Sequence, residues 1–268
     1  MQKWKLMLTT LPFVLAVTAV KVILDYGVHF GGVVEFADVG VVLTGAVFLT
    51  GFLLAGTMAD YKESEKLPGE VAANLEMLEE LFVFAGQAKP AIGPKDLQKQ
   101  VLSLTDTIKD WLVKKKTTAQ IYAALTDMNT AVLAMDKAGA NSDASKALPH
   151  VTSLRKAISR IDVISRTGFL PPAYALLEVL LGMILLLMMV AKFKSPVAEF
   201  VLIPFVSLVN IYMLRLIRDI DDPFDFAADG SKQGGAEVDL FPLDEYRERL
   251  AARVAASGVE VEGTRRAG

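Results

Sequence analysis

One run of residues combines side chains that could line an ion pathway with the length needed to cross a membrane. Thr44, Phe48 and Phe52 recur every four residues, which places them on one face of a helix. A narrow ring of phenylalanine side chains around an axis loses water readily, and such rings gate ion flow. The spacing therefore suggests ion passage through an apolar neck. The alternative is that both phenylalanines face lipid or a packed interior.

Glycines are scattered through the same run, and small residues let helix backbones approach closely in lipid. A helix with this much glycine needs close neighbours to hold it. We therefore expect close helix packing at Gly45, Gly51 and Gly56, with Gly40 in the same helix.

Glu178 is the one charged residue of another apolar stretch. An ionised carboxylate at membrane depth costs roughly 2.5 kcal/mol or more, so it must be neutral, paired or in contact with water. Functionally it could line a vestibule or couple transport to protons. Structurally it could bond to Ser, Thr or Tyr on a neighbouring helix. Glu199 lies near the expected membrane edge and is interpreted as interfacial.

An acidic cluster follows the last apolar stretch: Asp219, Asp221, Asp222 and Asp225. Carboxylates on a short loop can bind calcium, but the regular glycine of an EF-hand loop is missing. Asp219 and Asp222 are the candidate calcium ligands. The alternative is an acidic helix end that pairs with lysines or arginines of an adjacent subunit.

The chain lacks the motifs of common enzymes. It has no Gly-x-Ser-x-Gly, no phosphate-binding loop and no His-Glu-x-x-His. It has no cysteine, and His29 and His150 are far apart in sequence. We therefore expect no enzymatic activity, no cofactor and no resident metal. The net charge of -3 also argues against a nucleic-acid partner.

The elements that position these residues are four apolar stretches. Hydrophobic residues make up 53% of the chain and mean hydropathy is +0.40, yet 22% of residues are charged, so part of the chain lies in water. The second stretch has twenty residues without a charge, about enough to cross a ~30 Å hydrocarbon core. The predicted spans are Leu6 to Leu24, Val39 to Met58, Leu170 to Ala191, and Val197 to Leu214.

Charge asymmetry predicts the orientation. Lys3 and Lys5 precede the first span, and Arg215 and Arg218 follow the fourth, so both termini are expected in the cytoplasm. The loop 25–38 has only acidic charges and is expected outside. Lys192 and Lys194, between spans three and four, argue the other way. A cleaved signal peptide is a rival interpretation of the N-terminus, but apolar residues continue past Lys21.

Residues 60–169 show helical periodicity and are expected to form a cytosolic helical domain. Apolar residues recur at helical spacing from Leu97 to Trp111 and from Val151 to Ile161, and another amphipathic stretch runs from Val71 to Phe84. The lysines 114–116 suggest a solvated helix end or a lipid-headgroup contact. The predicted architecture is an all-α membrane protein with transmembrane hairpins at 1–59 and 170–217, the insert at 60–169, and a C-terminal cytosolic segment at 218–268 that is disordered from about Ser257.

Three short motifs stand in a distinctive order. They are the charged run Lys62 to Glu70, the block Leu170-Pro171-Pro172-Ala173-Tyr174, and Asp222-Pro223-Phe224 followed by Leu240-Phe241-Pro242-Leu243-Asp244. Together with the span layout they resemble the bestrophin family, which carries similar Lys-Leu-Trp-Gly-Glu, Ile-Pro-x-x-Tyr, Asp-Pro-Phe and Leu-Pro-Leu-Asp sequences. Asp60, Tyr61 and Lys62 stand where the family often has an arginine and two tryptophans. This departure is compatible with a related bestrophin-like branch.

The resemblance implies a homo-pentameric channel whose pore is formed by five copies of the second span, conducting anions in most members and cations in some. The family narrows at a neck of three hydrophobic residues one helical turn apart, which matches Thr44, Phe48 and Phe52. Thr44 departs from the usual aliphatic residue, and its hydroxyl would ease ion access. Animal bestrophins build a calcium clasp after the matching Pro-Phe, where this chain has Ala227, Ala228 and Gly230 across much of the acidic stretch.

Three functions follow as hypotheses. The first is an ion channel, with the chain itself, membrane lipid and permeant ions as partners and chloride favoured over cations. The second is a membrane-anchored helical scaffold or sensor without channel activity. The third is a small transporter that uses Glu178, although the two hairpins show no convincing repeat.

Overall fold

The computed structural model describes residues 2–30, 32–89, 92–168 and 171–266, and it is mostly helical. The chain divides into two compact units. The spanning unit holds residues 1–61, 167–223 and 234–237, and the bundle unit holds 62–166, 224–233 and 238–268. Leu170, the expected first residue of the third span, lies outside the described residues.

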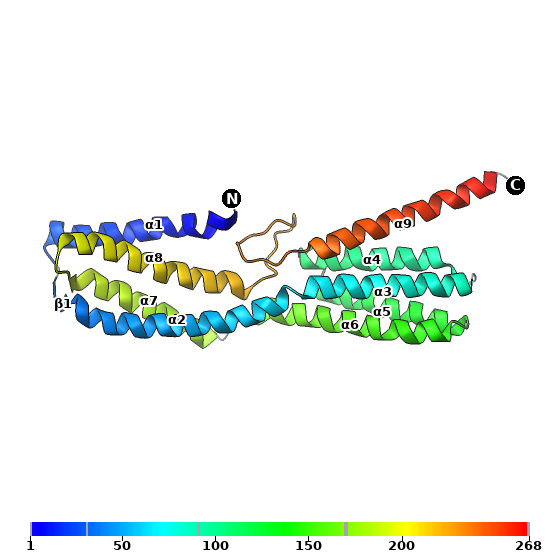
Figure 1. Ribbon diagram of the computed structural model, residues 1–268, viewed down its shortest axis with the longest axis horizontal. Helices are drawn as coiled ribbons and strands as arrows, with labels where there is room; N and C mark the ends of the chain where they lie inside the picture. Colours follow the sequence, from blue (N-terminus) through cyan, green and yellow to red (C-terminus); the bar gives the residue numbers. More distant parts are fainter. Residues whose placement is uncertain (1, 31, 90–91, 169–170, 267–268) are drawn as a thin grey trace. The chain divides into compact units, whose positions relative to one another are not determined.

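The helices of the spanning unit are long and apolar. Within the described residues, four helical segments are long and apolar enough to cross a membrane, so the chain is an integral membrane protein. The helices are α1 (Gln2–Val22), continued by the π-helix η1 (Ile23–Val28), α2 (Phe36–Ser64), α7 (Pro171–Val190) and α8 (Pro196–Asp221) (Figure 1). The predicted spans fall on these helices, apart from the two ends of the third: Leu170 lies outside the described residues and Ala191 lies in a short strand.

Packing inside the spanning unit centres on α8. The main partner of α1 is α8, and α7 also contacts both. The buried side of α2, at Val39 and Ala46, packs against Ile184 and Met188 of α7 and against residues of α8. The grouping of the spans into two hairpins therefore stays a prediction.

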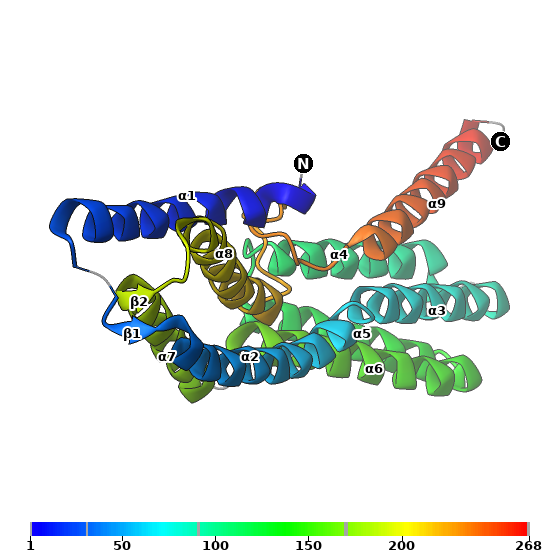
Figure 2. The same ribbon diagram turned by 60° about the vertical axis from the view of Figure 1, so that its left-hand side comes forward.

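A parallel pair of two-residue strands joins the ends of the spanning helices. Strand β1 (Val34–Glu35) pairs with β2 (Ala191–Lys192), with Val34 opposite Ala191 (Figure 2). Beside it, the buried Lys21 donates to the carbonyls of Met189 (3.0 Å) and Ala191 (3.1 Å) and to the carboxylate of Asp25 (3.0 Å). These bonds hold the end of α1 to the end of α7.

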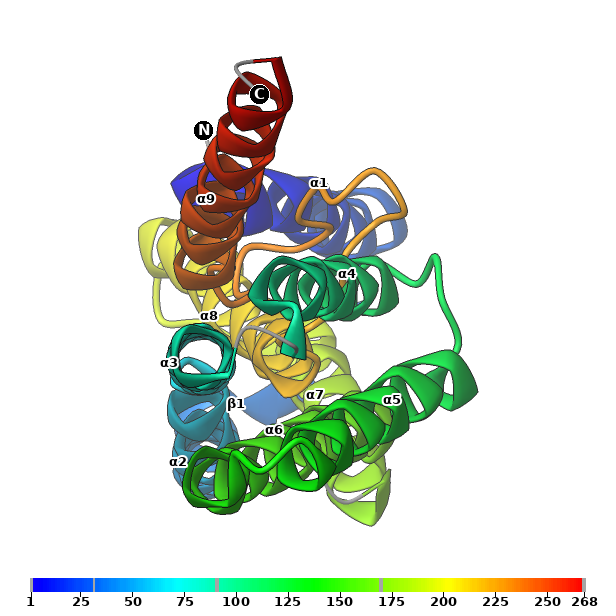
Figure 3. The ribbon, with the colours of Figure 1, turned by 90° about the vertical axis from the view of Figure 1, so that its right-hand side faces the viewer.

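The helices of the bundle unit (Figure 3) are α3 (Leu67–Ala88), α4 (Pro94–Leu112), α5 (Thr118–Lys137), α6 (Asn141–Arg166) and α9 (Phe241–Arg266). Most of the periodic apolar residues predicted for α3, α4 and α6 are buried, among them Val71, Val101 and Ile158. Trp111 is only partly buried, and Phe84 is exposed. Helix α5 was not predicted. It begins with a capping box, in which Thr117 and Gln120 exchange side-chain and backbone hydrogen bonds. Helix α9 includes the segment for which the sequence suggests a disordered tail.

Glu79 of α3 is a buried carboxylate at the centre of a polar network. Gln98 donates to it from α4 (3.0 Å), and Tyr246 (3.3 Å) and Arg253 (2.5 and 2.8 Å) donate from α9. Burial, and then the charge and hydrogen bond of Glu79, raise the pKa of Tyr246 above its ordinary value. Buried carboxylates are tolerated only with such partners, so this network fastens α9 to α3 and α4.

Replacing Glu79 with alanine is expected to lower the stability of the bundle unit by about 1–3 kcal/mol, because three donors lose their acceptor. Thermal unfolding followed by circular dichroism would show a lower melting temperature. The neighbouring Glu80 is exposed, and Glu80→Ala is the matched control, expected to change stability by less than about 0.5 kcal/mol. Equal shifts for the two variants would contradict a stabilising role for the network.

Candidate functional site

Helix α2 has one exposed face and one buried face. Thr44, Phe48 and Phe52 are not covered on the single chain, with Phe48 exposed at 73% and Phe52 at 69%. Val39, at 1%, and Ala46 belong to the buried side. An exposed aromatic row on a membrane helix faces lipid, another subunit or a pore, so the structure leaves this face available for any of the three.

The threonine hydroxyls of α2 are satisfied within the helix. Thr44 donates to the carbonyl of Gly40 (2.8 Å), Thr50 to Ala46 (2.8 Å), and Thr57 to Leu53 (3.2 Å). Back-bonds of this kind let a hydroxyl sit in an apolar environment without an unpaired donor. Thr44 thus reaches the exposed face without needing a partner on another helix.

Within the described part of a single chain, no side chain packs against the Cβ positions of Gly40, Gly45 or Gly51 of α2. A Cβ atom placed on Gly40, Gly45 or Gly51 would meet no other atom within 4 Å. Gly56 is partly buried. The close packing expected at Gly45 and Gly51 is therefore not made inside the described chain, and a helix of another copy would have to provide it.

Glu178 pairs with arginine. In the structure, Arg218 of α8 donates to the carboxylate of Glu178 on α7. Both side chains are about half exposed, at 52% for Glu178 and 53% for Arg218. The Ser, Thr or Tyr partner considered from the sequence is thus replaced by a charge of opposite sign. Nothing in the spacing of the sequence pointed to this pair, because forty residues separate the two.

Residues of the acidic cluster form hydrogen bonds and an ion pair with other segments of the chain. Asp219 accepts hydrogen bonds from the backbone nitrogen of Gly235 (3.0 and 3.3 Å), and a Cβ on Gly234 would overlap the Asp219 carboxylate. Asp225 pairs with Lys114 (2.6 Å) in the bundle unit, which accounts for one lysine of the 114–116 run. Asp222 follows the last turn of α8. Within the described ranges no group of three or more acidic, histidine or cysteine residues is placed to hold a metal.

The motif residues lie at the ends of helices. Pro171 begins α7, and Tyr174 packs one turn later against Leu177 and Ile217. Pro223 and Phe224, which follow α8, are buried.

The second half of the tail motif starts α9. The amides of Leu243 and Asp244 bond to the carbonyl of Leu240 (both 3.0 Å), and Pro242 lies in the same first turn. Asp244 also pairs with Lys109 of α4 (2.5 Å). In the charged run after the second span, Glu63 is bound by Arg160 through two hydrogen bonds (2.6 and 2.8 Å). These motifs therefore have structural partners in this fold.

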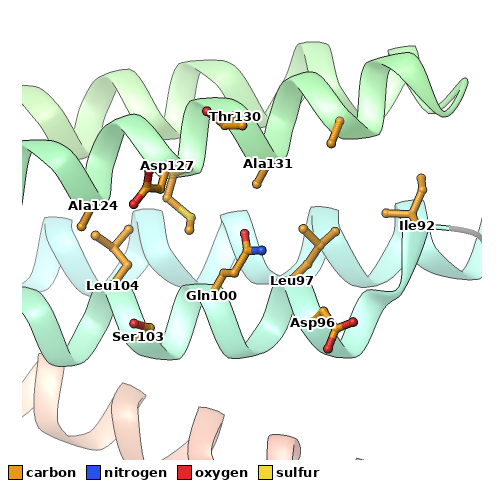
Figure 4. Close-up of a pocket in the computed structure, with 12 residues that line it drawn as sticks. Ile92, Asp96, Leu97, Gln100, Ser103, Leu104, Ala124, Asp127, Thr130 and Ala131 are labelled. Carbon is orange, nitrogen blue, oxygen red and sulfur yellow. The ribbon is translucent and has the colours of Figure 1, made fainter.

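A groove of about 530 Å³ runs between α4 and α5 in the bundle unit (Figure 4). Leu97, Leu104 and Met128 supply its apolar lining, and Asp96 and Asp127 supply acidic groups.

The comparisons with known proteins agree on one fold. The family model described as "Bestrophin-like domain" matches residues 32–226. A crystal structure of a bacterial bestrophin homolog from Klebsiella pneumoniae, solved by Zn-SAD phasing, has a TM-score of 0.75 at 13% identity, covering 93% of this chain and 98% of that one. A single-residue mutant of the Klebsiella pneumoniae homolog also gives a TM-score of 0.75 at 13% identity, with 90% and 97% covered. No curated protein sequence matches the chain.

A double-mutant cycle tests the ion pair between Glu178 and Arg218. Glu178→Ala and Arg218→Ala each leave one charge without its partner, whereas the double variant removes both. We expect a coupling of about 1 kcal/mol, so that the double variant loses less stability than the sum of the two single variants. Melting temperatures of the purified proteins in detergent measure this, and strictly additive shifts would count against the pair.

Proposed function

Because the chain belongs to the bestrophin-like domain family, we propose that it is an ion channel, assembled as a ring of identical chains with a pentamer favoured. Anions such as chloride are favoured over cations as the permeant ions. The neck is formed by α2, at Thr44, Phe48 and Phe52. Both termini and the bundle unit lie in the cytoplasm.

The observation that carries this proposal is the two-sided character of α2. Its buried side packs on α7 and α8, while the phenylalanines and the open surfaces of Gly45 and Gly51 lie outside the contacts of one chain. A helix that faced only lipid would have no need of several glycines, which weaken an isolated helix. Close contact with α2 of neighbouring copies gives the glycines a role and turns the phenylalanines toward a common axis.

A neck of this composition controls ion conduction by determining whether water fills the constriction. Rings of Phe48 and Phe52 side chains make a constriction that dries easily, so ions pass only when it is wetted or widened. Glu178 and Arg218 neutralise each other, so they add little net charge to any aqueous surface beside them. The proposed selectivity therefore depends on groups other than this pair.

The alternative function is a membrane-anchored scaffold or sensor. The observation that favours it is the groove between α4 and α5, which a partner segment could occupy. A scaffold needs no ring and no aligned α2 helices. The two functions therefore differ in assembly as well as in transport.

Electron microscopy of the purified protein in detergent tests the assembly. The channel proposal predicts ring particles, with five-fold symmetry favoured and α2 closest to the axis. A particle containing a single chain, or rings with Phe48 and Phe52 turned toward lipid, would favour the scaffold.

Ion flux into liposomes tests the neck. Phe52→Ala removes a ring from the proposed constriction, so we expect chloride flux to rise severalfold. Leu186→Ala is the control, since Leu186 is a large apolar residue on α7 that is exposed to the same extent as Phe52, at 70% against 69%. Sodium flux measured in parallel reports selectivity. The neck assignment fails if both variants alter flux to the same extent.

A further inference from the structure

The spanning unit contains a cavity of about 410 Å³ where α2 and α8 begin. Its walls include Phe36 and Phe193, whose rings lie 5.0 Å apart, and Leu202 of α8. Lys192, Lys194 and Glu35 supply the charged groups. A volume of this size is within the ~300–1,000 Å³ range of small-molecule sites.

Backbone pairing holds the walls of this cavity in place. Glu35 of β1 is in register with Lys192 of β2, and the backbone nitrogen of Val33 donates to the carbonyl of Val190 (3.0 Å). The side chain of Lys192 also rests on Gly32, with carbon atoms 3.6–3.7 Å from the position that a Cβ would take. Figure 2 shows the two strands side by side at the ends of α2 and α7. Backbone hydrogen bonds of the spanning unit thus fix the position of the cavity walls.

The two lysines carry charge that the described residues do not neutralise. No ion pair of the described chain includes Lys192 or Lys194, although Glu35 lines the same cavity. Asp25 is engaged elsewhere, because it is paired with the buried Lys21 (2.9 Å) and forms a hydrogen bond with Glu199. Asp38 of α2 does not line the cavity. The net charge of the cavity lining is therefore positive, which suits an anionic group.

The surroundings of the cavity are apolar and lie at the end of membrane-spanning helices. Beyond Leu202 along α8, Phe205 and Val209 follow at helical spacing and are exposed on the single chain. An anionic head held by lysines, with a hydrocarbon chain along such a stripe, is the arrangement of a phospholipid at a protein surface. Basic pockets between membrane helices bind anionic headgroups in this way.

We propose that this cavity binds the headgroup of an anionic phospholipid, with the phosphate near Lys192 and Lys194 and an acyl chain along Leu202 and Phe205. Lys192 and Lys194 lie between α7 and α8, where their positive charge argues against the proposed orientation of the chain. A bound anionic lipid would neutralise that charge. The proposal requires only the membrane location of the chain. It stands or falls separately from channel activity.

Native mass spectrometry of the detergent-purified full chain tests the proposal, with phosphatidylglycerol and phosphatidylcholine as probes. Wild-type protein is expected to retain phosphatidylglycerol preferentially. The double variant K192Q/K194Q should bind it at least about tenfold more weakly, because each lysine near a headgroup contributes to binding. The charge-matched control is K137Q/K146Q, which alters two exposed lysines of the bundle unit and should bind as the wild type does.

A second variant tests the contribution of the cavity's volume separately from the contribution of the lysine charges. Leu202→Trp fills the cavity while both lysines stay, and it should also reduce retention of phosphatidylglycerol, with circular dichroism confirming that the helices are intact. Equal retention of both lipids by wild-type protein would overturn the proposal, as would unchanged binding by K192Q/K194Q. Displacement of the lipid by inorganic phosphate, but not by chloride at the same ionic strength, would identify a free anion as the ligand and would equally overturn it.

Discussion

The spanning unit depends on one constraint, which is that a charge placed among apolar helices must find a partner within the protein. Lys21 shows the constraint most clearly: it is 1% exposed, and its ammonium group is met by one carboxylate and two backbone carbonyls. One carbonyl belongs to Met189 at the end of α7 and the other to Ala191 of β2, so satisfying this charge also fixes where α1 lies against the end of α7. Glu178 obeys the same rule through Arg218 of α8. Charges that look like exceptions in an apolar sequence are therefore cross-links between helices.

The sequence predicted those features that depend on local pattern. Uncharged length located the spans, and apolar residues three or four positions apart located α3, α4 and α6, because burial of one face requires that spacing. Helix α2 nevertheless runs from Phe36 to Ser64, well past the predicted end at Met58, since its polar last turns remain helical beyond the apolar stretch. Helix α5 was not predicted, although its buried residues Ile121, Leu125 and Met128 recur at helical spacing. Thr117 and Gln120 give a second local signal, the capping box at its start.

Contacts between residues far apart in the chain could not be predicted from the sequence. The parallel pairing of Val34 with Ala191 joins segments far apart in the chain, and strands of two residues leave no alternation to detect. The partner of Glu178 and the network around Glu79 likewise join residues on different helices. For the proposed neck residues, sequence and structure agree that Thr44, Phe48 and Phe52 share a face of α2, while what that face meets is a property of the assembly.

The back-bond of Thr44 has a consequence for any solute that touches this side chain. Its hydroxyl hydrogen is committed to the Gly40 carbonyl, so the atoms left outward are the methyl group and the oxygen lone pairs. A halide reaching this level would find a donor only if the hydroxyl gave up its bond to the Gly40 carbonyl by rotating about the Cβ–Oγ bond. A metal cation would find an acceptor already oriented. The torsion about the Cβ–Oγ bond of Thr44 would thus decide whether an ion at this level of α2 meets a donor or an acceptor.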